Sequence, residues 1–130
     1  MVRSVFRVLL VLWAGSLWSL AAWVAPTLFY AQGDRHLAGV LAARLFSIET
    51  YLGIAVGVLA LLLPGRSRMG GVYVAAVLLA VNEWVLKRFM ESARVHGAAI
   101  GFVAWHGVSA ILYIVACLGV LLVIWKENFR

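Results

Sequence analysis

The sequence predicts an all-α integral membrane protein: a single domain over residues 1–130, built as an up-down-up-down bundle of four transmembrane helices. Two observations lead to this fold class. Hydrophobic residues make up 65% of the 130 residues, and the mean hydropathy is +1.03. The apolar residues also form long blocks, and the first, from Val8 to Gly33, runs for 26 residues without a formal charge. A helix needs only about 20 apolar residues to cross the roughly 30 Å of hydrocarbon in a bilayer.

Four apolar blocks follow one another, with helices expected at 5–30, 37–63, 70–89 with a polar extension to 96, and 98–125. The first block is longer than the core of a signal peptide and has no small-residue cleavage site, so we expect it to remain as a helix. Pro26 is expected to kink this helix near its end. Asp34 can cap the second helix, and Pro64–Arg68 ends it in a tight turn. Such short loops make consecutive helices antiparallel neighbours.

The net charge of +6 is distributed as expected for membrane topology, so nucleic acid is not an expected partner. In a four-helix chain the two termini and the second loop share one side of the membrane. That side carries six basic residues against four on the other, which predicts an inner (plasma) membrane protein with both termini in the cytoplasm. The six are Arg3, Arg7, Arg66, Arg68, Lys126 and Arg130, and the four are Arg35, Lys87, Arg88 and Arg94.

Small residues four positions apart, such as Gly53 and Gly57, allow helix backbones to approach one another closely. We expect these contacts within the chain, and a homo-oligomer or a larger membrane complex is the alternative. The partner that the composition itself implies is the lipid bilayer. Cys117 is the only cysteine, so it has no internal disulfide partner and is expected to be a small buried residue.

Polar side chains on three helices are expected at a similar depth, in the half of the bundle away from the termini. Counted from His36 and Gly97 at 1.5 Å per residue, Arg44 lies about 12 Å inside, Glu49 about 20 Å and His106 about 14 Å. Counted from Arg94 at the same rise per residue, Glu83 lies about 17 Å inside. The candidate residues for ligand binding or proton relay are Arg44, Glu49, Asn82, Glu83, Lys87, His106, Ser109 and Tyr113.

Helical spacing suggests which of these side chains meet. Arg44 is about 140° around the helix from Glu49, so its expected partner is Glu83 on another helix. Glu83 and Lys87 are also one turn apart, in the favourable orientation for an ion pair. Buried ion pairs rarely stabilise a protein more than apolar packing does. The cluster therefore has two interpretations: a structural lock, or a polar cavity that opens to the outside.

Several segments resemble the transmembrane-protein-205-like family. They are Trp13-Ala14-Gly15, Val24–Phe29, Ala38-Gly39, Arg44-Leu45-Phe46 and Trp105–Ser109, in the same order over nearly the whole chain. The resemblance implies a four-helix inner-membrane protein and supplies no activity. The family pattern has an asparagine soon after its H-G-x-S segment, where this chain has Tyr113 nearby. A more distant likeness is to HemJ-type four-helix protoporphyrinogen oxidases and to copper-resistance membrane proteins.

The sequence favours a non-enzymatic role, because it has no Ser-His-Asp order, phosphate-binding glycine loop or HExxH motif. The expected function is to bind a small polar or ionic ligand, to move protons, or to dock a partner membrane subunit. The alternatives are a haem-binding membrane oxidoreductase and an accessory subunit of a larger complex. Haem or a metal thus stays open as a cofactor, and His106 is the one histidine expected inside the membrane as a ligand.

Overall fold

The computed structural model describes residues 1–64, 69–97 and 99–128. Arg66, Arg68 and Arg130, and most of the turn expected at Pro64–Arg68, lie outside these residues. The first helix comprises α1 (Val2–Ser19), the π-helical turn η1 (Leu20–Val24) and α2 (Ala25–Ala31). The second is α3 (Arg35–Leu62), and the third comprises α4 (Gly70–Val81), the π-helical turn η3 (Asn82–Leu86) and α5 (Lys87–Val95). The fourth is α6 (Ala99–Asn128).

Each of these four continuous helices contains a segment that is long and apolar enough to span a membrane. No strand occurs among the described residues. The predicted fold class, an all-α protein with four membrane-spanning helices, is confirmed. Only helices that satisfy their own backbone hydrogen bonds, or closed barrels, are stable in hydrocarbon, which is why the apolar blocks take this form.

Local chemistry explains how the helices begin and where the first one bends. Asp34 caps α3, since its Oδ1 atom accepts hydrogen bonds from the backbone N–H groups of His36 and Leu37 at 2.8 and 3.3 Å. Pro26 has no N–H group, and its ring clashes with the carbonyl one turn earlier in a regular α-helix. The preceding turn, η1, is widened, and Ala25 donates to Leu20 five residues back. The kink expected at Pro26 therefore takes the form of a π-helical turn.

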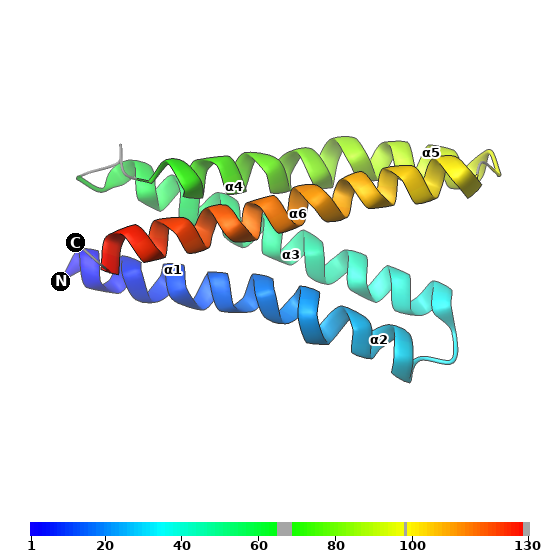
Figure 1. The fold of residues 1–130 in the computed structure, drawn as a ribbon, viewed down its shortest axis with the longest axis horizontal. Helices are drawn as coiled ribbons and strands as arrows, with labels where there is room; N and C mark the ends of the chain where they lie inside the picture. The colour runs from blue at the N-terminus through cyan, green and yellow to red at the C-terminus, as the bar shows by residue number, and fades with distance from the viewer. Residues whose placement is uncertain (65–68, 98, 129–130) are drawn as a thin grey trace.

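Figure 1 shows both termini at one end of the bundle, here called the terminus end, and the loops after α2 and α5 at the opposite, far end. Within the terminus half, α4 packs against α3 and α6, and α1 packs against α3 and α6. Helices α4 and α6 approach closely at Gly71 and Gly119, where a Cβ atom on Gly71 would overlap the Gly119 carbonyl oxygen. The apolar core also lies here; it includes Phe6, Leu10, Trp13, Leu17, Val72, Leu79, Cys117 and Val120.

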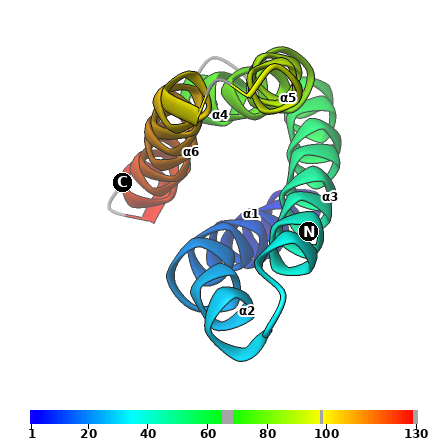
Figure 2. The same ribbon diagram turned by 90° about the vertical axis from the view of Figure 1, so that its right-hand side faces the viewer.

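The far half of the molecule divides into two arms. The α2–α3 arm is residues 25–46, and the α5–α6 arm is residues 87–97 and 99–112. Within each arm the helices pack together, α2 on α3 and α5 on α6. Figure 2, which faces the far end, shows the two arms apart from each other. Neither α2 nor α5 has a buried side chain. The core therefore holds the helices together at the terminus end and leaves the arms separate.

Candidate functional site

Glu49 is the one buried acidic residue among the described side chains, with 7% of its surface exposed. It lies on the face of α3 that meets α1, one turn before Gly53, where an added Cβ would come within 2.6 Å of Cζ2 of Trp13. The hydroxyl of Ser16 in α1 donates a hydrogen bond to Oε1 of Glu49. The other oxygen, Oε2, is buried and has no hydrogen-bond partner among the described residues. Glu49 thus faces a close-packed neighbouring helix with half of its carboxyl group unpartnered.

Tyr113 of α6 lies in the neighbourhood of Glu49, since it contacts Phe46, one turn before Glu49, and Leu17, the residue after Ser16. Its hydroxyl donates a 2.6 Å hydrogen bond to the backbone carbonyl of Leu17 in α1. Its ring makes an edge-to-face contact with Phe46 of α3, with 4.9 Å between ring centroids and an interplanar angle of 86°. Three helices, α1, α3 and α6, therefore converge around Glu49 through Ser16, Phe46 and Tyr113.

Glu83 belongs to a separate polar cluster, between α3 and the third helix. Nζ of Lys87 lies 2.8 and 2.9 Å from the two carboxylate oxygens of Glu83. The same Nζ donates to the hydroxyl of Ser47 in α3 at 2.7 Å, and that hydroxyl is also 2.7 Å from Oε1 of Glu83. The side chains of Glu83 and Lys87 are 13% and 37% exposed. This cluster is an ion pair near the fork between the two arms.

The expected pairing of Arg44 with Glu83 is wrong. Arg44 is exposed on the side of α3 opposite its buried face. It makes no ion pair or hydrogen bond within the part of the chain that the structure describes. Lys87 takes its place because it lies one turn from Glu83 on the same helix, which requires no contact between helices.

Asn82 and Ser109 join η3 to α6. The Asn82 side-chain amide donates to the Ser109 carbonyl at 3.2 Å, and the Ser109 hydroxyl donates to Oδ1 of Asn82. His106, one turn further toward the far end, was expected in the bundle interior but is exposed. It lies two turns from Tyr113 and so on the same face of α6. At the far end of the molecule the two arms lie apart from each other (Figure 2).

The eight candidate residues are therefore not one cluster. Glu49 with Tyr113, Glu83 with Lys87, and Asn82 with Ser109 form three neighbouring groups, while Arg44 and His106 are exposed. Their functional role stays a prediction. Ser16, Ser47 and Phe46, which complete these groups, were missed. Ser16 and Ser47 could have been identified as serines in apolar helices at the depth of a carboxylate, because a buried carboxylate needs hydrogen-bond donors.

A comparison with known protein families adds one finding. Residues 8–125 match a family described as a domain of unknown function, DUF4149. The chain belongs to this family. Comparisons of this DUF4149 chain with curated proteins and with solved structures gave no match. The likeness to the transmembrane-protein-205-like family stays a prediction.

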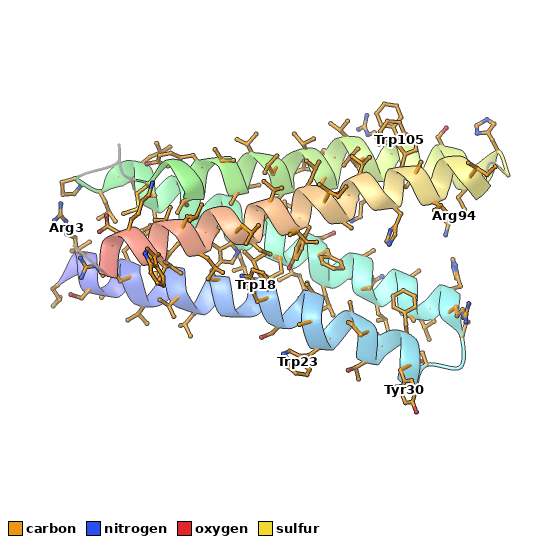
Figure 3. The ribbon with its side chains drawn as sticks, in the orientation of Figure 1. Arg3, Trp18, Trp23, Tyr30, Arg94 and Trp105 are labelled. Atoms are coloured by element: carbon orange, nitrogen blue, oxygen red, sulfur yellow. The ribbon has the colours of Figure 1, made fainter. Side chains whose placement is uncertain are left out.

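Tryptophans indicate how deep the groups of this DUF4149 protein lie. Trp105 and Trp125 are separated on α6 by about 30 Å, the thickness of the hydrocarbon, and tryptophan prefers its borders. Trp105 stacks on Phe89 of α5 at 4.7 Å, and Figure 3 shows it on the α5 side of α6. This preference predicts a far border near Phe89. The depths counted from His36 and Gly97 stay predictions.

A border near Phe89 would also account for the exposed side chain of Arg44. Ser47 is level with Lys87, two residues before Phe89, and Arg44 lies about one turn further toward the far end. The guanidinium of Arg44 can therefore reach the lipid headgroups, as long basic side chains near helix ends do. In the described part of this DUF4149 protein, no group of three or more His, Cys, Asp and Glu side chains is placed to hold a metal ion.

Proposed function

We propose that this multi-pass membrane protein binds and releases a proton at Glu49. The observation that carries the proposal is the Oε2 atom of Glu49, which is buried without a hydrogen-bond partner among the described residues. No basic side chain in that part of the chain forms an ion pair with Glu49. An ionisable group inside a membrane is retained at a cost, and proton movement is one of the functions that such groups serve.

The surroundings of Glu49 favour a proton over a larger ligand. Burying a carboxylate without a cation costs free energy, and the cost is relieved when the group takes up a proton or a cation. Lys87 is not available as the cation, because it bonds both oxygens of Glu83. Ser16 already donates to Oε1, so Oε2 is the atom that would hold the proton. A proton also needs no cavity beside the carboxyl group.

A polar ligand would need such a cavity. A surface pocket of about 300 Å³ lies along η1 and α2 and includes none of the candidate site residues. It is lined by Trp23, Val24, Thr27, Leu28, Ala31 and Gln32. These side chains are mostly apolar, so this pocket does not favour a small polar or ionic ligand.

The orientation belongs to the proposal. With the terminus end in the cytoplasm of an inner (plasma) membrane, the arms face the outside, in agreement with the bias of basic residues. A cysteine at Ser92 in α5 should then react with an impermeant thiol reagent added to intact cells, and one at Ser67 should not. The opposite labelling pattern would reverse the orientation.

The test of the proton site uses dicyclohexylcarbodiimide, a lipid-soluble reagent that adds to protonated carboxyl groups in apolar surroundings. The purified protein in lipid vesicles is treated over a range of pH, and the adducts are located by peptide mass spectrometry. We expect an adduct on Glu49 whose yield falls as the pH rises. Glu83 is the internal control: its carboxylate is paired with Lys87, so it should stay unmodified.

Two variants complete this test. Glu49→Gln should abolish the adduct, whereas Glu83→Gln should leave it unchanged. Absence of a Glu49 adduct even at acidic pH, or equal modification of Glu83, would overturn the proposal. An absorbance spectrum of the same preparation addresses the haem alternative, because a Soret band would favour a haem protein instead.

A further inference from the structure

Phe46 and Tyr113 lie between Glu49 and the separated arms. Phe46 is three residues before Glu49 on α3, about one turn nearer the far end. Its ring meets the ring of Tyr113 from α6 edge to face, with centroids 4.9 Å apart. These two side chains therefore form a layer across the bundle on the far-end side of Glu49.

The Tyr113 hydroxyl joins this layer to the first helix. It donates to the carbonyl of Leu17, which lies one turn before the residues of η1, where the first helix is widened. Leu17 is fully buried, and Tyr113 is 5% exposed. The hydrogen bond thus connects α6 to α1 just before η1, the turn that leads into the α2–α3 arm.

The burial of side chains changes at this layer. Among the α6 side chains that the structure describes, Tyr113 is the first buried one counted from the far end. Ser109 is partly buried and His106 is exposed, although both lie on the inward face of α6. On the other side of the layer, Glu49 and Cys117 are buried. The layer thus marks the boundary between the open far half and the closed terminus half.

We propose that Phe46 and Tyr113 form a gate that controls access to Glu49 from the far end of the bundle. The proposal rests on the proposed function, since it names the route to the same proton site. With the gate closed, the aromatic rings keep water from the carboxyl group. When the hydroxyl of Tyr113 leaves Leu17, the rings separate and Glu49 can exchange its proton with the far side.

Thiol accessibility tests the gate without relying on protonation. Glu49→Cys is made in a Cys117→Ser background, and a charged, impermeant methanethiosulfonate reagent is added to each face of oriented vesicles. Cysteines at Ser92 and at Ser4 identify the far and terminus faces. The reactivity of each cysteine is normalised to that in denatured protein. We expect the cysteine at position 49 to react slowly from the far face, much more slowly than one at Ser109.

Opening the gate should then raise this reactivity. Phe46→Ala should increase the far-face rate at position 49 several-fold and leave the terminus-face rate unchanged. Tyr113→Phe keeps the ring and removes the hydrogen bond to Leu17, so it should give a smaller increase with less risk to folding. The matched control is Phe89→Ala, which removes an aromatic ring from the α5–α6 arm beyond the gate and should have no effect.

Three results would overturn the gate. The first is equal far-face reactivity at positions 49 and 109, which means that no layer separates them. The second is faster reaction from the terminus face, and the third is no change in either gate variant. Each of these can occur together with a carbodiimide adduct on Glu49. Failure of the gate is therefore distinguishable from failure of the proton site.

Discussion

At the scale of single residues, Glu83, Asn82 and Ser109 each find hydrogen-bonding partners among nearby groups. Glu83 is paired by Lys87 on its own helix, and Ser47 from α3 completes the cluster. Asn82 and Ser109 satisfy each other. Glu49 receives one donor, Ser16, and this incomplete satisfaction distinguishes it from the other carboxylates.

Removing Lys87 should destabilise the protein. Lys87→Met leaves the largely buried Glu83 with Ser47 alone, and we expect a loss of about 1–3 kcal/mol, below the range for a fully buried pair because Lys87 is partly exposed. Combining Lys87→Met with Glu83→Gln should recover most of this loss. Thermal unfolding in detergent, followed by tryptophan fluorescence, measures both effects.

Arg44→Met is the matched control for this prediction. Arg44 has no ion pair among the described residues, so the unfolding midpoint of this variant should be close to that of the wild type. A loss as large as that of Lys87→Met would mean that Arg44, and not Lys87, is the effective partner of Glu83.

Two adjacent glycines allow a paired test of helix packing. A Cβ atom at Gly71 would overlap the Gly119 carbonyl, whereas one at Gly70 would meet nothing within 4 Å. Gly71→Ala should therefore push α4 away from α6 and destabilise the protein by about 1–3 kcal/mol, the usual cost of overpacking. Gly70→Ala should be neutral or slightly stabilising. Equal unfolding midpoints for the two variants would contradict the close crossing.

At the scale of elements, two of the four helices contain a π-helical turn. η1 precedes Pro26, which removes a backbone donor and crowds the turn before it. η3 has no proline nearby and carries Asn82 and Glu83, both of which bond to side chains or backbone of other helices. Such turns are rare and often occur where a helix carries functional groups.

Pro26→Ala should convert η1 toward a regular α-helix. The new N–H group restores a donor, and the ring no longer clashes with the preceding turn. We expect amide hydrogen exchange over residues 20–25 to slow in this variant, as measured by mass spectrometry in detergent. Residues 82–86 serve as the internal control and should exchange at the wild-type rate. Unchanged exchange over 20–25 would show that Pro26 is not the cause of the widened turn.

The sequence predicts the helices well and the contacts between them poorly. Hydropathy and helix length locate the four spans, because these properties are local. The partner of Glu83 depends on which residues face one another, and the angle of Arg44 on a single helix does not decide that. Likewise His106 lies on the predicted face of α6, but its exposure follows from the separation of the arms, which is a long-range property.

At the scale of the whole molecule, the core joins all four helices at the terminus end and leaves the far end with two arms. Regions with few buried contacts open and fluctuate more readily than a packed core. Spin labels at Tyr30 of α2 and Arg94 of α5, which Figure 3 places on opposite arms, measure this directly. We expect a broad distance distribution between them by pulsed electron paramagnetic resonance.

The control pair for this measurement lies at the terminus end. Labels at Leu12 of α1 and Leu122 of α6, both exposed on packed helices, should give a narrow distribution. Distributions of equal width at the two ends would mean that the arms are held as firmly as the core.

The separated arms also give the molecule a wedge-shaped outline, broader at the far end than at the terminus end (Figure 1). In a bilayer the broader end would lie in one leaflet. Acyl chains in the broader leaflet press sideways on the arms, while those in the opposite leaflet press on a rigid bundle. A lipid mixture that raises the lateral pressure in the leaflet around the arms would favour a narrower arrangement of the arms. A mixture that lowers this pressure would favour a wider one. A change in the bilayer would thus shift the arrangement of the arms as a ligand would, without occupying a binding site.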